Sequence, residues 1–153
     1  MLLYLVQHAE AKREEEDPAR DLTEKGRRDL QKVAGYLGKF HLPVSRIFHS
    51  GKTRAQSTAN LLAASLPPAH GVEAAAGLAP LDDPEIWAAR LEQLDENLML
   101  VGHLPHLAKL AARLLAGDEQ KKVINFHMAG VICLRREAGQ WAVEWLLIPE
   151  LID

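Results

Sequence analysis

Two short, uninterrupted runs of apolar residues constrain the possible folds of this chain more than any other feature. They span Leu2–Val6 and Leu98–Val101, and each is far too short to cross a membrane. A continuous apolar run of this length is typical of a strand that is buried on both faces of a parallel sheet. A histidine stands two residues beyond each run, His8 after the first and His103 after the second. The sequence therefore predicts buried strands that end in polar segments.

Helical patterns separate these runs. Thr23 precedes a segment with apolar residues at Leu30, Val33 and Leu37, which indicates a capped amphipathic helix. The prolines at 84 and 105 stand where further helices are expected to begin. Helices are predicted over residues 24–37, 53–66, 84–94 and 105–117, further strands over residues 45–48 and 72–75, and an exposed loop over residues 12–21.

The C-terminal part of the chain changes period. Residues 130–136 and 140–148 resemble two strands joined by a turn around Ala138, which predicts an antiparallel hairpin. Strands that alternate with helices and end in such a hairpin predict an α/β fold in three layers, with a mostly parallel central sheet flanked by helices. No repeat, low-complexity tract or linker divides the sequence, so residues 1–153 are expected to form a single domain.

Composition excludes several classes of protein. The 153 residues include 18 lysines and arginines against 21 acidic residues, and the net charge of -3 argues against a nucleic-acid-binding protein with a strongly basic surface. The single cysteine, Cys133, excludes an intramolecular disulfide framework and a thiolate zinc cluster. No basic region precedes the N-terminal apolar run, so we expect a cytoplasmic protein that does not associate with a membrane.

Several chemically versatile side chains mark one edge of the expected sheet. Ligands of such sheets bind beyond the C-terminal ends of the strands, and this rule selects His8, Ser50 and His103. Arg54 opens the helix that follows the second strand. A neutral imidazole can attack phosphorus, and a guanidinium offers a planar fork that matches phosphate oxygens. The set is therefore suited to phosphoryl chemistry, which needs no metal ion and no cofactor here.

A metal site is a weaker interpretation of the same region. His103 and His106 are three residues apart, but no further histidine or acidic ligand follows at helical spacing. We therefore interpret His106 as a packing residue at the start of a helix.

Four segments resemble those of a known family. Leu5–Ala11 resembles the Arg-His-Gly-Glu/Asp-Ala signature of the histidine phosphatase superfamily, and Leu22–Gly26 resembles its Leu-Thr-x-x-Gly segment. Ser50–Ala59 is similar to its Ser-x-x-x-Arg-Ala-x-x-Thr-Ala helix start, and Val101–Pro105 to its second-histidine segment. The segments occur in the family's order over roughly residues 2–110. In its small size the chain resembles the SixA-like phosphohistidine phosphatases, a group within this phosphoglycerate mutase-like superfamily.

The resemblance implies a role for each matching residue. His8 would be the nucleophile that becomes transiently phosphorylated, and Arg54 would bind the phosphoryl oxygens. His103 would hydrogen-bond the transferring group and, as a cation, offset charge in the transition state. The implied substrate is a phosphohistidine-bearing protein of a phosphorelay or phosphotransfer system.

The sequence departs from the family pattern at two neighbouring positions. Gln7 stands where the family has its first arginine, and a neutral amide in place of a charged donor lowers transition-state binding by about 1–2 kcal/mol, or about tenfold in rate. Lys12 or Lys52 would be candidates to compensate by contributing to the phosphate site. Ala9 replaces the signature glycine, which matters only if the backbone there requires a positive φ.

A general acid is not evident in the sequence either. The stretch from Gly77 to Asp83 lacks a carboxylate at the place where larger relatives carry a glutamate, and Asp82 and Asp83 are expected to cap the next helix. An alcohol leaves poorly without an acid, whereas the imidazole of phosphohistidine leaves readily near neutral pH. This absence favours a phosphohistidine substrate. Two alternatives stay open: a phosphate- or phosphohistidine-binding module that has lost catalysis with its first arginine, and a small-molecule phosphomonoesterase.

Overall fold

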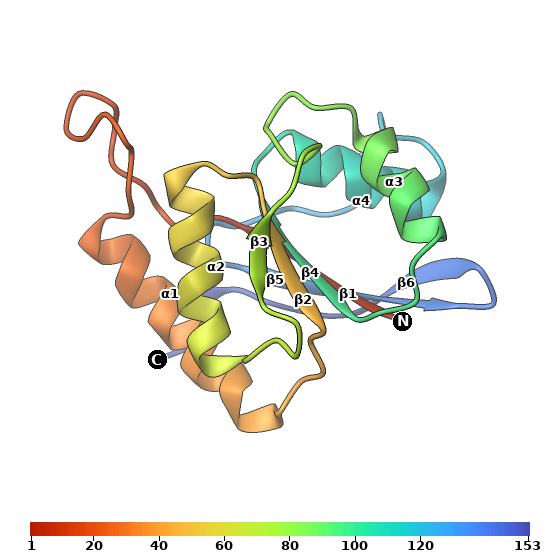
Figure 1. Cartoon of the computed structure of the whole chain (residues 1–153), viewed down its shortest axis with the longest axis horizontal. Coiled ribbons are helices and arrows are strands. Elements are labelled where there is room, and N and C mark those ends of the chain that lie inside the picture. The colour runs from red at the N-terminus through yellow and green to blue at the C-terminus, as the bar shows by residue number, and fades with distance from the viewer.

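The computed structural model describes all residues, 1–153, and is built around a six-stranded sheet (Figure 1). The strands follow the spatial order β3-β2-β4-β1-β5-β6. Their bounds are β1 Leu2–Gln7, β2 Arg46–His49, β3 Val72–Ala74, β4 Leu98–Gly102, β5 Val131–Glu137 and β6 Gln140–Leu147. The first four strands are parallel to one another, whereas β5 runs antiparallel to β1 and pairs with β6 in the terminal hairpin. The predicted α/β fold with its C-terminal hairpin is confirmed.

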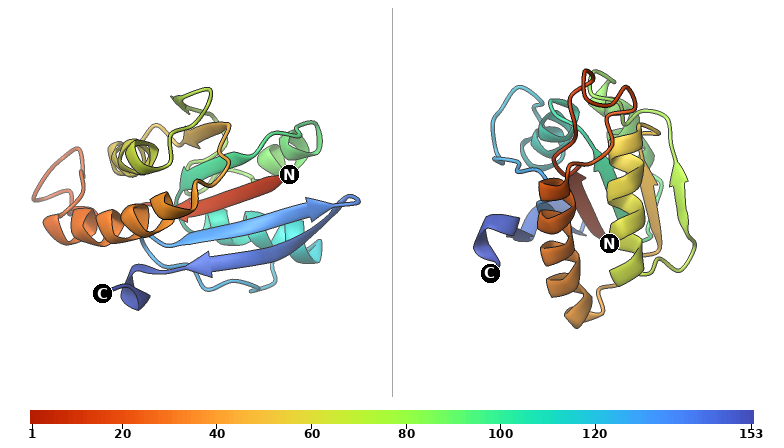
Figure 2. Two further views of the ribbon diagram at one scale, coloured as in Figure 1. Left: turned by 90° about the horizontal axis from the view of Figure 1, so that it is seen from below. Right: turned by 90° about the vertical axis from the view of Figure 1, so that its left-hand side faces the viewer.

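Two pairs of helices cover the two faces of the sheet (Figure 2). The helices are α1 Glu24–Leu37, α2 Thr53–Ser65, α3 Pro84–Glu92 and α4 His106–Ala116, with short 3-10 helices at Gly38–Phe40 and Pro149–Leu151. Tyr4 and Val6 of β1 pack in the core beneath α1 and α2, while Leu3 and Leu5 pack in the core beneath α3 and α4. All four side chains are fully buried, which explains why the first strand is apolar without interruption.

The segment boundaries differ from the predicted ones by only a few residues. The second strand extends to His49 and β5 extends to Glu137, each one residue beyond its predicted end. The helix α3 ends at Glu92 instead of residue 94, and Pro105 precedes α4 as its cap. Ends of elements depend on local capping and fraying, which sequence patterns define poorly. No helix combines the length and apolar character that crossing a bilayer requires.

Candidate active site

Parallel pairing brings the predicted site residues to one edge of the sheet. Strand β4 lies between β1 and β2, with Gln7 opposite Gly102 and His49 opposite Val101. The next residues along the three strands are His8, Ser50 and His103, so they emerge together at the C-terminal edge. The rings of His8 and His103 lie 5.0 Å apart between centroids. The strand-end interpretation thus placed these two histidines correctly beside each other.

Hydrogen bonding defines which nitrogen of His8 is available for reaction. Its Nδ1 lies 2.7 Å from the carbonyl oxygen of Ala9, and a carbonyl oxygen can only accept. Nδ1 therefore carries the proton in the neutral ring, and the lone pair lies on Nε2. The hydrogen bond made by one ring nitrogen of a histidine determines which nitrogen carries the proton and which is free to react. The His8 ring is thus held in the tautomer whose Nε2 is free to accept a bond.

The residues after His8 are held by helix α2. The amide of Ala9 donates to Oγ1 of Thr58, a fully buried residue whose hydroxyl donates to the carbonyl of Arg54. Thr58 belongs to the segment that resembles the Arg-Ala-x-x-Thr-Ala helix start, which explains the need for a hydroxyl at this spacing. The backbone φ of Ala9 is not positive, so alanine fits here without strain in place of glycine.

The start of α1 packs tightly against the same segment. Oγ1 of Thr23 accepts from the amide of Gly26 and thereby caps the helix, as predicted. A Cβ on Gly26 would collide with the backbone carbonyl oxygen of Glu10, so only glycine allows this approach. The Thr23 hydroxyl also lies 2.9 Å from Oε1 of Glu10, to which it donates. The Leu-Thr-x-x-Gly segment therefore supports the turn that follows the nucleophile.

The electrostatic surroundings keep His8 neutral. Burial lowers the pKa of its imidazole below 6.5, the bond to Ala9 opposes this effect, and the positive charges of Arg54 and Arg20 lower the pKa further. A neutral imidazole retains its lone pair at physiological pH. The environment of His8 thus favours a neutral ring, the form that can act as a nucleophile.

His103 is also neutral in the ligand-free protein. The residue is only 2% exposed, and burial together with the charges of His8, Arg54, Lys52 and His106 lowers its pKa to about 3. This result does not agree with a cationic His103 before substrate binds. Its Nε2 lies 2.6 Å from Oγ of Ser50, so Ser50 contacts the second histidine at the end of β2.

Arg54 is a free cation within the site. It lies in the first turn of α2, its Nε is buried, and neither this nitrogen nor the rest of the guanidinium bonds to another group of the protein. Burial and the charge of Arg20 lower its pKa from the normal arginine value, although a guanidinium stays protonated. An unpaired, partly buried guanidinium at a helix N-terminus is suited to bind an anion.

The sequence interpretation missed Arg20. The loop over residues 12–21 is exposed in part, as expected, but it is closed at its base by a hydrogen bond from Lys12 N to Asp21 O. Arg20 adopts a left-handed conformation with φ 52, and its Nε donates to the Lys12 carbonyl. The guanidinium is half-buried, and its charge acts on both His8 and Arg54. Nothing in residue spacing indicated this, because the contact depends on how the loop folds back over α2.

The remaining candidates for the phosphate site occupy different positions. Lys52 caps α2, and its charge reaches His103, whereas Lys12 acts on the carboxyls of Glu16 and Asp21. Oε1 of Gln7 is buried without a hydrogen-bond partner. The charge of Arg20 acts on His8 and Arg54, and that of Lys52 acts on His103, so both are candidates to supply the positive charge of the missing arginine.

Substitution of Arg20 by glutamine should reveal its charge in the pH profile. In the wild type we expect the acidic limb of kcat/KM below pH 6.5, because protonation of His8 removes the nucleophile and its pKa is lowered. Loss of the nearby cation raises this pKa, so the limb should move to higher pH, and kcat/KM should fall about tenfold at pH 8. Steady-state kinetics from pH 5 to 8.5 would measure both, with Arg13→Gln as a control in the same loop. An unmoved limb would contradict the role.

The expected capping role is confirmed for Asp83, whereas Asp82 does not cap the helix. Asp83 accepts from the amide of Glu85 at the start of α3, and Asp82 accepts from the amide of Ala79 in the preceding turn. Both carboxylates are thus engaged in local structure.

His106 packs in the core at the start of α4. It is fully buried, and neither of its ring nitrogens has a hydrogen-bond partner. The structure contains no group of three or more histidine, cysteine or acidic side chains arranged to hold a metal ion. The packing interpretation of His106 is confirmed.

Replacing His106 by leucine should stabilise the protein. Two buried, unpaired nitrogens are unfavourable, and their removal should raise the free energy of unfolding by about 1–3 kcal/mol in urea titrations at pH 7. The gain should grow as the pH falls below 6.5, because the unfolded histidine binds a proton that the buried ring, with its lowered pKa, resists. A destabilised variant would indicate a partner for the ring.

Together, a tautomer-defined imidazole, a second neutral imidazole and unpaired cations form a site suited to phosphoryl groups. The model of the histidine phosphatase superfamily (branch 1) matches residues 3–80. An uncharacterized protein of Picosynechococcus sp. (strain ATCC 27264 / PCC 7002 / PR-6) is 34% identical over 147 residues, which cover 92% of this chain and 88% of that protein. The chain belongs to the histidine phosphatase superfamily.

Solved structures with the same fold act on different phosphorylated compounds. The protein histidine phosphatase SixA in complex with tungstate has a TM-score of 0.85 at 22% identity, and the match covers 99% of both chains. The phosphoserine phosphatase of Entamoeba histolytica, in complex with phosphoserine, has a TM-score of 0.69 at 14% identity over 95% of both chains. A mycobacterial glucosyl-3-phosphoglycerate phosphatase has a TM-score of 0.69 at 17% identity over 94% of this chain and 97% of that one. These likenesses confirm the phosphoglycerate mutase-like fold. Because the named phosphatases differ in their substrates, the fold alone does not specify the substrate of this chain.

Proposed function

We propose that this protein is a metal-independent phosphohistidine phosphatase that hydrolyses the phosphoryl group of a phosphorelay or phosphotransfer protein in the cytoplasm. The observation that carries the proposal is the orientation of His8, whose Nδ1 proton is donated to Ala9 and whose Nε2 is left as the nucleophile, with the positive charges of Arg54 and Arg20 acting on the ring. Membership of the histidine phosphatase superfamily supports the phosphatase class. The remaining steps follow from the chemistry of the surrounding groups.

In the first step, Nε2 of His8 attacks phosphorus. The new P–N bond forms on His8 while the P–N bond of the substrate breaks, and the departing imidazole takes that electron pair. When the other nitrogen of the substrate ring carries a proton, the imidazole leaves as a neutral molecule and needs no acid. The Nδ1 proton of His8 stays on the ring, which is a cation while it is phosphorylated.

The cations of the site oppose the charge of the transferring group. Arg54 binds phosphoryl oxygens as a planar fork, and Arg20 contributes a second positive charge. His103 donates a hydrogen bond to the phosphoryl group through Nε2 and exchanges its contact with Ser50 for one with the substrate. Gln7 offers its amide NH2 group, and Lys52 adds positive potential at the start of α2. Bound phosphate raises the pKa of His103, because a nearby anion favours the imidazolium.

In the second step, water attacks the phosphoryl group on His8. The P–O bond forms as the P–N bond breaks, the electron pair returns to Nε2, and inorganic phosphate is released as H2PO4⁻ with both protons of the water. His8 is then neutral again. No step requires an oxidant, a metal ion or a cofactor.

Leaving-group chemistry favours phosphohistidine over phosphate esters. The aspartates nearest to the expected acid position cap local structure, and the Glu10 carboxylate accepts a hydrogen bond from Thr23. An ester oxygen would therefore leave without an evident proton donor. We expect a phosphohistidine-bearing phosphotransfer protein to be dephosphorylated at least about 100-fold faster, by kcat/KM, than a phosphoserine peptide or phosphoglycerate. Efficient turnover of the esters with none of phosphohistidine would instead identify a small-molecule phosphomonoesterase.

Gln7 motivates a second candidate function, a phosphohistidine-binding module without catalysis. The substitution Gln7→Arg distinguishes the two. Because Arg20 already supplies positive charge, we expect a rise in kcat/KM of about tenfold or less on the phosphorylated phosphotransfer protein. Gln7→Lys serves as a control for charge without the planar fork. Activity that appears only in the Gln7→Arg variant would show that the natural chain is a binding module.

A further inference from the structure

A cavity of about 310 Å³ lies directly beside the proposed nucleophile. Gln7 and Leu104, the neighbours of His8 and His103 in the chain, form its wall on the side of the active site. Helix α1, the segment before β5 and the C-terminal 3-10 helix supply the other walls. The cavity is thus reached from the same strand ends as the phosphoryl site, and no step described above uses it.

Negative charge predominates in this cavity. Its lining includes the carboxylates Glu10, Asp29 and Glu150 against a single lysine, Lys25. Lys25 is bound to Asp29 at 2.6 Å, and the charges of Asp29, Glu10 and Glu150 help to raise its pKa, which indicates that the carboxylates are clustered around it. One cation cannot neutralise three anions. The cavity therefore presents an acidic wall, with His127 3.9 Å from Glu150 at its rim.

The neighbouring phosphoryl site carries the opposite charge to this acidic cavity. There the unpaired charges are those of Arg54, Arg20 and Lys52, whose fields lower the pKa values of His8 and His103. A molecule that carries a phosphoryl group at one end and a positively charged nitrogen at the other matches both halves. Such polarity would repel a leaving group that bears a carboxylate.

Apolar surface and an unpaired acceptor complete the cavity. Leu104 and Met128 are 40% and 43% exposed, and Phe126 lies in the same lining, so a flat ring could pack against them. Gln7, at the boundary with the phosphoryl site, has a buried amide oxygen without any hydrogen-bond donor. A change in the Gln7 rotamer would turn this oxygen toward the cavity, where an N–H group of a bound ring would be its donor.

We propose that this cavity is the leaving-group subsite and that it takes a cationic, N–H-bearing heterocycle such as the imidazolium side of phosphohistidine. The inference rests on the proposed function and specifies what selects the substrate. The phosphoryl group lies among the cations, and the ring lies between the apolar wall and the carboxylates. Charge in the cavity then discriminates against anionic leaving groups, in addition to the lack of an evident proton donor for ester oxygens.

Glu150 provides the sharpest test, because it lies in the terminal 3-10 helix and bonds to none of the residues proposed to bind the phosphoryl group. We would compare kcat/KM for a phosphohistidine-bearing phosphotransfer protein with kcat/KM for p-nitrophenyl phosphate, whose leaving group is an anion. In Glu150→Lys the ratio of the two should fall about tenfold or more, and in Glu150→Gln about threefold. Imidazole should also inhibit nitrophenyl phosphate hydrolysis more weakly in both variants.

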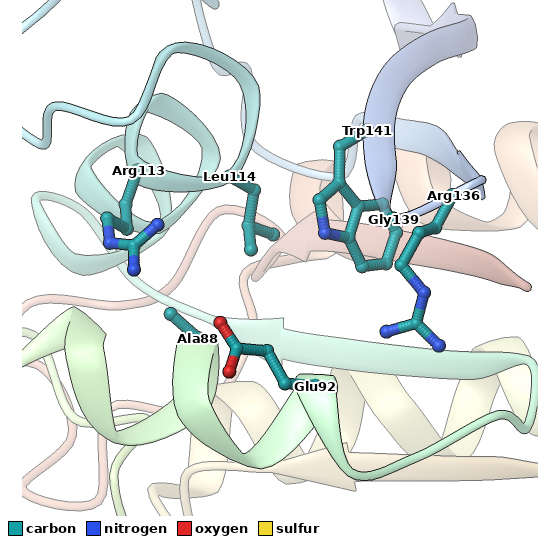
Figure 3. A pocket seen from close by; sticks show the side chains of 7 residues that line it. All are labelled: Ala88, Glu92, Arg113, Leu114, Arg136, Gly139 and Trp141. Carbon is teal, nitrogen blue, oxygen red and sulfur yellow. The ribbon is translucent and has the colours of Figure 1, made fainter.

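The matched control is Glu92→Lys, which makes the same change in net charge at the opposite end of the sheet. Glu92 lines a cavity of about 330 Å³ beside the hairpin turn (Figure 3). The two arginines there are already engaged: Arg113 bonds to Glu85, and Arg136 donates to the carbonyls of Leu91 and Leu94. The control should leave the ratio unchanged.

The outcomes separate this inference from the proposed function. An unchanged ratio and unchanged imidazole inhibition in Glu150→Lys, in a folded protein, would overturn the subsite. Failure of the proposed function would look different: the wild type would hydrolyse p-nitrophenyl phosphate but not phosphohistidine, or would form no phosphoenzyme with either. A fall of the ratio in both Glu150 variants but not in Glu92→Lys would support the subsite.

Discussion

His8→Ala is expected to abolish turnover, with a loss in kcat of roughly 10³-fold or more, because the variant has no nitrogen to accept the phosphoryl group. The structure orients this ring through the bond from Nδ1 to Ala9, and no other histidine has its Nε2 at the same place. His103 is 5.0 Å away between ring centroids, but its Nε2 faces Ser50. A second imidazole in the site is thus not a ready substitute.

The measurement has two parts. Rapid acid quench with a radiolabelled phosphohistidine protein should trap an acid-labile phosphoenzyme in the wild type and none in His8→Ala, while steady-state assays show the parallel loss of turnover. His70→Ala is a suitable control, because this histidine is exposed in a turn far along the chain. Undiminished activity in His8→Ala would refute the mechanism.

Arg54→Ala should have the second-largest effect, a fall in kcat/KM of about 10²–10³-fold. The guanidinium has no partner within the protein, so the lost interaction is with the substrate alone. For the same reason the free energy of unfolding should not fall, and it should rise slightly, since an unpaired, partly buried cation is removed. Arg54→Lys should recover only part of the activity, because an ammonium lacks the planar fork.

This combination of effects separates a phosphate ligand from a structural arginine. Arg28→Ala, on the exposed face of α1 with a weak 3.9 Å pair to Glu24, should change neither activity nor stability. Kinetics on the phosphohistidine substrate and urea unfolding would measure both properties. Loss of stability in Arg54→Ala in proportion to its loss of activity would show that Arg54 mainly supports the fold.

Much of the fold could be predicted because each signal is local. The burial of both faces of β1 requires an apolar run, and caps such as Thr23 and Asp83 satisfy the free amides at the starts of helices. Strand ends then place His8 and His103 near each other, since parallel strands present their C-terminal ends at one edge. The family segments follow the same logic, as Thr58 and Gly26 show through their contacts with Ala9 and Glu10.

The protonation state of His103 could not be predicted in this way. A cation was expected from the charge that develops in the reaction, but burial, together with the charges of Arg54 and Lys52, lowers the pKa of the ring and makes it neutral before substrate binds. Such an effect depends on distances across several elements. Spacing along the chain does not encode it.

The sequence by itself determined the order of strands and helices, the family and the two histidines at the strand ends, because these depend on periodicity, capping and short motifs. Only the tertiary structure decided that Arg20 acts on His8 together with Arg54, and which cavity is lined by Gln7, the residue before His8. Arg20 is brought to His8 by the folding of its loop, and the acidic cavity combines α1 with residues more than 100 positions further along the chain. Both are long-range juxtapositions, and charge at a distance acts through space rather than along the sequence.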